Sequence, residues 1–433
     1  MASTGVDVPA AVSQRSRFAV AVVVITAVAV AVRVLYVVLV AQHHAPLGFD
    51  STAYYLIAGP LAHGHGYSDG VIAFSHRYVP TANYPPLYPL FLAALQRAGL
   101  QSVFQARVAS SVVGAATVPL VALVGRRLAG PRVGIAAAAL TAVWPFLIAT
   151  DGSLMSETIA VPLVTAALLA TLWARDAQRL SRWVVAGVLF AFAALARAEA
   201  PLLMVIVVGV TLLAARELSV RVRLEMGAAA LVGFAVISAP WVGYVVHEVG
   251  VGGLWATDSA KTLAGANCPS TYYGPNIGLW DSACTTGVDY PKVTEREAAS
   301  LNRQHAEDYV RAHKTRAPLV AAVRVLRTAG LYAPRQQHDF EVIESRNPSW
   351  QTLAWWCYIA LLPFAVYGLV VLVRRRRGAV VIIAALGAIA FASAISDGNE
   401  RLRSVVEPQI LVAAAAALVA LEARVRRRDV NAA

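Results

Sequence analysis

A single acidic residue, Asp50, lies in the segment GFDSTAYY, just after the first long apolar run of the chain at residues 18–41. That run is long enough to cross a bilayer as a helix. We therefore expect Asp50 at the boundary between water and lipid, with Tyr54 and Tyr55 one turn later, as in an interfacial helix. A carboxylate held at this boundary could do chemistry on a lipid-linked substrate, or it could simply cap the following helix.

Further ionisable residues lie at turns between later apolar runs, where a charge near membrane depth costs about 2.5–3.5 kcal/mol. They are Asp151, Glu157, Arg197, Glu199, Glu400, Arg401 and Arg403. Each has a purely structural alternative. Glu157 could complement a helix N-terminus, Arg197 could pair with Glu199, and the arginines of the last turn could be solvated. All these turns are predicted to lie on one side of the membrane, which favours a common site.

The composition is typical of a polytopic membrane protein. Of 433 residues, 58% are hydrophobic and only 14% are charged, whereas about a quarter would be charged in a soluble domain. The net charge of +12 would suggest a nucleic-acid partner in a soluble chain. Here the arginines lie beside the apolar runs, so the charge is explained by membrane topology and nucleic acid is excluded as a partner.

Ten apolar runs are candidate membrane-spanning helices in an all-α protein. They cover residues 18–41, 106–124, 133–150, 156–174, 183–197, 201–215, 226–247, 353–373, 379–396 and 405–421. The runs at 183–197 and 201–215 are short for a full crossing unless they are tilted.

Arginines mark every second connection between these runs. Examples are Arg126 and Arg127, Arg175 to Arg182, and the run Arg374–Arg377. By the positive-inside rule, both termini are predicted to be cytoplasmic in a multi-pass plasma-membrane protein. We expect an N-terminal membrane module at 1–247 with an outer loop at 42–105, an outer segment at 248–352, and C-terminal helices with a basic tail at 353–433.

The outer segments carry residues that could bond to each other or to a metal. Cys268 and Cys284 could form a disulfide if that face is oxidising, or they could be unpaired. Five histidines in the first outer loop invite a metal hypothesis, but their spacing matches no standard zinc pattern. They are His43, His44, His63, His65 and His76. We therefore assign no cofactor, with a divalent metal as the alternative.

The outer segment is also predicted to contain amphipathic helices. Thr294 and Glu297 fit a capping box that begins a polar helix running to about His313. Apolar residues then recur at helical spacing between 319 and 326, with Arg324 and Arg327 between them or just beyond. This pattern suits a helix on the outer leaflet, or equally a helix packed in an outer domain.

The order of these features resembles the GT-C fold glycosyltransferases, particularly the superfamily of protein-O-mannosyltransferases and aminoarabinose transferases. The matching segments are FDSTAYYLIAGPLAHGHGY, NYPPLYPLFLAAL, SETIAVPLVTAALL, ARAEAPLL, SAPW, AEDYVRAHKTRAPLVAAVRVLRTAGLYAP and ERLRSVVEPQILVAAAA. They cover most of the chain in the family's order. The chain departs from many relatives in one respect: Ser51 follows Asp50 where they carry an Asp-Glu pair. A second acid must therefore come from elsewhere.

The resemblance implies an inverting transfer of a sugar such as mannose or arabinose from a polyprenyl-phosphate donor to an acceptor hydroxyl. The acceptor would be a glycolipid, glycan or protein at the outer face of the membrane. Asp50 would be the base, and Glu157, or else Asp151, would orient the acceptor. Arg401 and Arg403 would bind the donor phosphate. Further candidates for substrate contact are Tyr54, Tyr55, Tyr84, Tyr88 and Arg197.

A transporter of lipid-linked sugars or other solutes is the competing class. Transporters place their charged residues near the bilayer midplane. In this chain the charged residues gather at one predicted face, which favours an enzyme.

Overall fold

The computed structural model describes residues 8–44, 47–177, 179–251, 255–289, 292–375 and 378–432. Arg376 and Arg377 of the predicted basic run lie outside these ranges. The described residues form helices and connecting turns, with isolated bridges and no β-strand. The prediction of an all-α membrane protein is confirmed.

Each of the ten predicted runs is helical. Six helices or joined helices are long and apolar enough to span a membrane: Arg15–Ala41, Val103–Ala129, Glu157–Arg175, Val220–Val249, Pro348–Arg374 and Glu400–Arg427. A seventh candidate is the pair α7 (Pro131–Ala142) and α8 (Pro145–Asp151), which is bent by 57°. The other three are shorter: α10 (Leu180–Ala196), α11 (Ala200–Ala214) and α19 (Ala379–Ile395). Ten crossings therefore remain a prediction that depends on these short helices.

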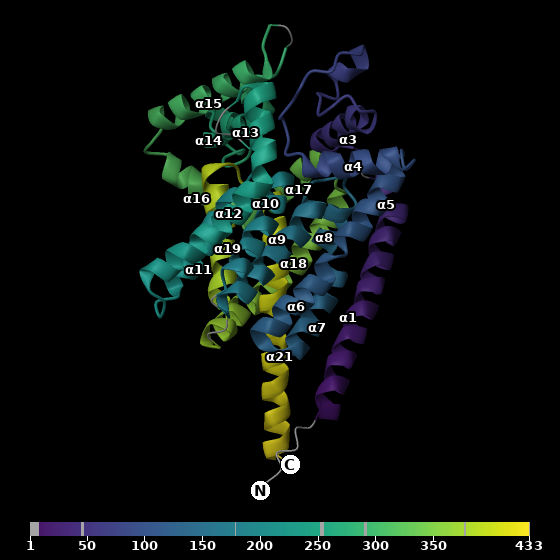
Figure 1. The fold of residues 1–433 in the computed structure, drawn as a ribbon, viewed down its shortest axis with the longest axis vertical. Helices are drawn as coiled ribbons and strands as arrows, with labels where there is room; N and C mark the ends of the chain where they lie inside the picture. The colour runs from purple at the N-terminus through teal and green to yellow at the C-terminus, as the bar shows by residue number, and fades with distance from the viewer. Residues whose placement is uncertain are drawn as a thin grey trace.

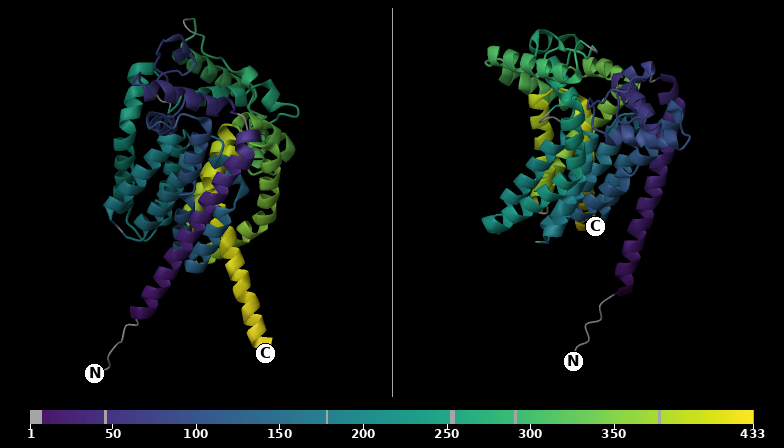
Figure 2. Two further views of the ribbon diagram at one scale, coloured as in Figure 1. Left: turned by 90° about the vertical axis from the view of Figure 1, so that its right-hand side faces the viewer. Right: turned by 45° about the horizontal axis from the view of Figure 1, so that its top comes forward.

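The long helices form one bundle, with smaller helices at one end of it (Figure 1). Helix α9 (Glu157–Arg175) and the first half of α21 (Glu407–Ala432) are buried in the bundle. By contrast, α1 (Val8–Tyr36), α12 (Val220–Tyr244) and α18 (Pro348–Arg374) expose many large apolar side chains, as lipid-facing helices do. Helix α1 begins and α21 ends at the same end of the bundle, opposite the smaller helices (Figure 2).

Small residues bring pairs of these helices into close contact. A Cβ atom on Gly187 of α10 would lie 1.9 Å from the Ala230 carbonyl oxygen of α12, and one on Gly233 would lie 2.3 Å from the Val184 oxygen. Apolar burial gives little preference for helix pairing within lipid, so close backbone packing of this kind is what holds such helices together.

The end of the bundle opposite the termini is covered by the two predicted outer segments. The first contributes α3 (Phe49–Ala62) and α4 (Leu87–Arg97). The second contributes a larger set of helices. These are α13 (Asp258–Ala266), α14 (Pro269–Tyr272), α15 (Glu295–Ala312), α16 (Ala317–Thr328) and α17 (Pro334–Phe340).

A buried carboxylate joins the two outer segments. Glu295 accepts hydrogen bonds from the Thr81 hydroxyl at 2.7 Å, the Ala82 amide at 2.8 Å and the Thr257 hydroxyl at 2.5 Å. The predicted capping box of Thr294 and Glu297 at the start of α15 is confirmed. Since both segments share this carboxylate, they form one cover over the end of the bundle.

Helix α16 is packed rather than lying free on a surface. Val320 and Val323 belong to a small core with Tyr272 and Ile277. Arg324 and Arg327 are also buried and donate to backbone carbonyls, including Ile277 O at 2.6 Å from Arg327. Leu319 and Leu326 face outward. The structure thus selects packing within an outer domain, with one apolar edge left exposed.

Candidate active site

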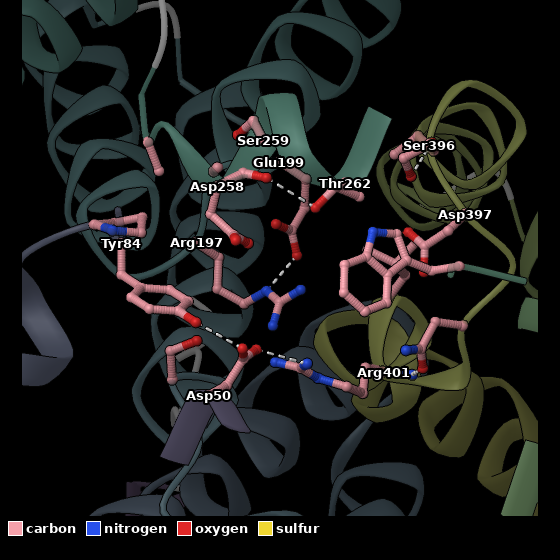
Figure 3. Close-up of a pocket in the computed structure, with 18 of the residues that line it drawn as sticks. Asp50, Tyr84, Arg197, Glu199, Asp258, Ser259, Thr262, Ser396, Asp397 and Arg401 are labelled. Atoms are coloured by element: carbon pink, nitrogen blue, oxygen red, sulfur yellow. Dashed lines mark hydrogen bonds and ion pairs between the residues drawn. The ribbon is translucent and has the colours of Figure 1, made fainter. Parts of the chain in front are cut away.

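A cavity of about 370 Å³ lies where the two outer segments meet the ends of the bundle helices. Its lining comes from α3, the turn after α10, α13, the turn before α18 and the segment 395–402. The charged residues of the lining are Asp50, Arg197, Glu199, Asp258, Glu344, Asp397 and Arg401. Figure 3 shows six of these seven, from distant parts of the chain, around one space. The predicted gathering of turns at one face therefore occurs.

Arg401 is the centre of this arrangement. Its Nη1 lies 2.9 Å from Asp50 Oδ2 and 2.5 Å from Glu344 Oε1, and its Nε lies 2.7 Å from Glu157 Oε1. Asn399 caps the short helix α20 (Glu400–Arg403) by accepting from the Arg401 amide, which fixes the backbone there. One guanidinium thus contacts three carboxyl groups, and none of its described hydrogen bonds uses Nη2.

Asp50 is held from two sides. Arg401 contacts Oδ2, and the Tyr84 hydroxyl donates to Oδ1 at 2.7 Å. The Asp50 side chain is 23% exposed, whereas the Glu157 side chain is 0% exposed. Asp50 is therefore the one of these two acids that a substrate can reach. Burial raises the pKa of Tyr84 well above its ordinary value, so the phenol remains a donor.

Asp50 does not cap its helix. Gly48 is the N-cap of α3, and Ser51 supplies the side chain that accepts from the Gly48 amide at 2.9 Å. The Asp50 carboxylate is thereby left for Arg401 and Tyr84. The Ser51 hydroxyl also lies 2.5 Å from the Ser345 hydroxyl, so Ser51 joins α3 to the turn containing Glu344.

Glu157 is buried beneath the cavity and contacts Arg197, which lines it. Arg197 Nη1 lies 2.7 Å from Glu157 Oε1, the same oxygen that Arg401 contacts. Arg197 also pairs with Glu199, so the predicted local pair is confirmed. Glu157 begins α9 and bridges the two arginines, which makes it a group that positions them.

Three acids of the cavity were not selected from the sequence: Asp258, Glu344 and Asp397. Burial raises the pKa of Glu344 to about 8, against the opposing charge of Arg401. Burial and the negative charge of Asp50 raise the pKa of Asp258 to about 7. Glu344 supplies a second acid beside Asp50. Its signal in the sequence is weak, because it lies in a polar stretch before a span with no apolar periodicity around it.

Several predicted residues lie away from the cavity. Arg403 is directed to the other side of α20, where it contacts Glu407 at 2.7 Å and lies 3.8 Å over the Tyr358 ring. Asp151 is buried against Arg33 at 2.7 Å. Tyr55 donates to the Gln101 carbonyl, and Tyr88 lies 3.1 Å from the Ser110 hydroxyl. Tyr54 does line the cavity, between Ser156 and Tyr84.

The predicted cysteines and histidines can be examined as possible metal ligands. Cys268 and Cys284 form a disulfide. Within the described ranges, the one group of three metal-ligating side chains with their ligand atoms close together consists of these cysteines and Asp281. Its sulfurs are bonded to each other, so it offers no thiolate. No described histidine joins such a group; the side chain of His44 is outside the description. The structure thus supplies no preformed metal site at these residues.

The fold matches solved membrane enzymes. The archaeal oligosaccharyltransferase AglB from Archaeoglobus fulgidus, in complex with an inhibitory peptide and a dolichol-phosphate, superposes with a TM-score of 0.55 at 15% identity. The match covers 97% of this chain and 52% of AglB. The chain has the GT-C fold. A second structure of the Archaeoglobus fulgidus oligosaccharyltransferase, with Zn and sulfate, gives a TM-score of 0.52 at 14% identity and covers 94% and 50% of the two chains.

The GT-C fold agrees with a match in sequence. Residues 83–243 match the family described as dolichyl-phosphate-mannose-protein mannosyltransferase. ArnT from Cupriavidus metallidurans, bound to undecaprenyl phosphate, gives a TM-score of 0.47 at 15% identity and covers 89% and 77% of the two chains. No curated protein matches the chain significantly in sequence. The chain spans about half the length of the oligosaccharyltransferase that it matches.

Proposed function

We propose that this protein is a membrane glycosyltransferase that uses a polyprenyl-phosphate-linked sugar. The observation that carries the proposal is a partly exposed carboxylate, Asp50, held by Arg401 and Tyr84 in a cavity at one end of a GT-C bundle. The match of residues 83–243 to a dolichyl-phosphate-mannose-dependent family and the dolichol-phosphate bound to AglB support this class of donor.

In the proposed reaction the acceptor hydroxyl attacks the anomeric carbon of the donor sugar. Asp50 takes the hydroxyl proton as the new C–O bond forms, and the bond from the anomeric carbon to the phosphate oxygen breaks. The electron pair of that bond leaves with the lipid phosphate. Attack opposite the leaving group inverts the anomeric configuration. A positioned general base of this kind contributes about 10²–10⁴-fold to a rate.

The leaving phosphate needs positive charge. Arg197 and Arg401 line the cavity, and the described hydrogen bonds of both use Nε and Nη1 but not Nη2. We assign the phosphate to these Nη2 groups, since a guanidinium N–H donates a strong charge-assisted hydrogen bond to a phosphate oxygen. Arg403 is committed to Glu407 and the Tyr358 ring. Arg197 therefore takes the role that the sequence suggested for Arg403, and Glu157 positions both arginines.

We infer the sugar, the acceptor and the orientation in the membrane from the sequence. The sugar is mannose or an arabinose-like pentose, and the acceptor is a glycolipid, glycan or protein. The cavity faces the outer side of the plasma membrane, with both termini in the cytoplasm, because the arginine-rich connections lie at the other end.

The test is transfer from a labelled polyprenyl-phosphate sugar by purified protein in liposomes. Asp50→Asn should lower kcat at least about 100-fold, because the amide keeps the shape but cannot accept the proton. Asp308→Asn, on the exposed face of α15, is the matched control and should retain the wild-type rate. Full activity of a folded Asp50→Asn protein would refute the assignment. Movement of the donor across the bilayer without transfer would instead identify a transporter.

A further inference from the structure

A second cavity, of about 630 Å³, lies at the opposite end of the bundle from the active-site cavity. It is formed by α6 (Thr117–Ala129), α9 and α10, and its lining includes Leu123, Arg126, Arg127, Ala166, Ala170 and Trp173. We call it the distal groove. Glu157 and Trp173 are sixteen residues apart on α9, which is about 24 Å along the helix axis. The distal groove is therefore a separate site.

The distal groove has an apolar interior and a charged end, which match the tail and the headgroup of a lipid. Its interior is lined by leucines and by the small side chains of Ala166 and Ala170, which leave space between the helices. Leu123 and Trp173 are 42% and 39% exposed on this helix surface. Arginine and tryptophan gather at the end of the groove where the helices end, the arrangement found at the level of lipid headgroups.

The polar end of the groove carries excess positive charge. Arg127 pairs with Asp176 at 2.6 Å, and Arg182 lies 4.3 Å over the Trp173 ring. Arg126 lies 4.7 Å over the Phe18 ring. Among the described residues, neither Arg126 nor Arg182 has a carboxylate partner. In addition, Nε of Arg127 is buried and has no hydrogen-bond partner within the described part of the chain. An anion at this end of the groove would compensate the charge of the arginines that lack a carboxylate partner.

We propose that the distal groove binds one anionic glycerophospholipid of the adjacent leaflet. An acyl chain lies between α6, α9 and α10, and the lipid phosphate faces Arg126 and Arg127. Basic pockets between membrane helices on the cytoplasmic side bind anionic headgroups in this way. The arginines and the apolar lining fit a phosphate that carries an aliphatic tail. We infer a glycerophospholipid rather than the polyprenyl-phosphate donor because the proposed donor site lies at the other end of the bundle.

The test is native mass spectrometry of the full-length protein, purified in detergent and incubated with phosphatidylglycerol, with phosphatidylcholine of the same chains, or with a polyprenyl phosphate. The wild type should retain one phosphatidylglycerol. Arg126→Gln with Arg127→Gln should lower the retained fraction about tenfold, because each arginine near the headgroups contributes to anion binding. Ala166→Phe should do the same by filling the groove while keeping every charge.

The matched control removes two charges near the same end of the bundle, Arg221→Gln with Arg223→Gln at the start of α12, and should bind as the wild type does. Size-exclusion profile and thermal midpoint report folding of each variant. Undiminished retention in the arginine variant and in Ala166→Phe would overturn the site. Equal retention of phosphatidylcholine would overturn the anionic headgroup. Loss of the bound phosphatidylglycerol when an equal concentration of polyprenyl phosphate is added to the same sample would overturn the choice of lipid. This readout does not depend on glycosyl transfer.

Discussion

Nη1 of Arg401 lies 2.9 Å from Oδ2 of Asp50, although 351 residues separate them in the sequence. The first outer loop and the last membrane helix thus meet in one ion pair. Because the same guanidinium also contacts Glu157 and Glu344, the position of the proposed base depends on one arginine.

Replacing Arg401 should therefore affect stability as well as activity. Arg401→Gln removes the partner that Asp50 and Glu157 share, and breaking a buried ion pair costs about 3–5 kcal/mol. We expect a lower thermal midpoint and loss of transfer. Arg311→Gln removes an arginine that contacts Glu307 and Asp308 on the exposed face of α15 and should change neither. An Arg401→Gln protein with a wild-type midpoint would show that the carboxylates do not need this guanidinium.

Asp258 should make stability depend on pH. Its pKa is raised from 3.8 to about 7, so the folded protein binds this proton more tightly than the unfolded chain does. The resulting stabilisation is complete below about pH 3.8 and is lost as the pH rises through about 7. Asp258→Asn should flatten the fall of the thermal midpoint between pH 5 and pH 8. Asp308→Asn serves as the exposed control, and identical curves for wild type and Asp258→Asn would contradict the prediction.

The disulfide should hold part of the active-site wall. The segment from Cys268 to Cys284 contains Trp280, which lines the cavity and donates to the Lys261 carbonyl at 3.1 Å. Closing a loop of this length stabilises a fold by about 2–4 kcal/mol. Cys268→Ser with Cys284→Ser should lower the thermal midpoint and raise KM more than it lowers kcat. Cys357→Ser, in α18, is the control. Unchanged KM would show that Trp280 keeps its place without the bond.

Asp151 should act on stability alone. It is buried against Arg33 and does not line the cavity. Asp151→Asn leaves the arginine uncompensated and should cost about 3–5 kcal/mol, whereas Arg33→Met with Asp151→Leu should recover most of the loss. Thermal midpoints and kcat per folded molecule separate the two effects. A normal thermal midpoint with a low kcat would contradict this prediction and would indicate that Asp151 acts on the substrate.

The membrane helices were predictable because lipid imposes a simple rule on length and hydrophobicity. Charged residues at the turns on one side of the bundle then had to meet, so Asp50, Glu157, Arg197 and Arg401 were found together from the sequence. Asp258 and Glu344 were not found, since they lie in outer segments whose path is set by packing between distant residues, such as the contacts of Glu295.

The sequence held evidence against two of the predicted roles, phosphate binding by Arg403 and acceptor binding by Asp151. Arg401 and Arg403 are two positions apart on a short helix, so their side chains leave on different faces and could not both reach one site from it. Arg33 lies within the first span, and an ionisable residue at that depth needs a partner. That requirement pointed to a structural carboxylate such as Asp151.

The order of synthesis gives the Arg401 contacts a consequence for assembly. The chain is made from its N-terminus, so Asp50, Glu157 and Glu344 all leave the ribosome before their shared guanidinium. Until α20 and α21 are in place, these three acids lack the contact with Arg401, although Glu157 can already pair with Arg197. In a nascent protein that ends before residue 400, Asp50 therefore lacks its arginine partner, and we expect this ion pair to form only when the last helix is inserted.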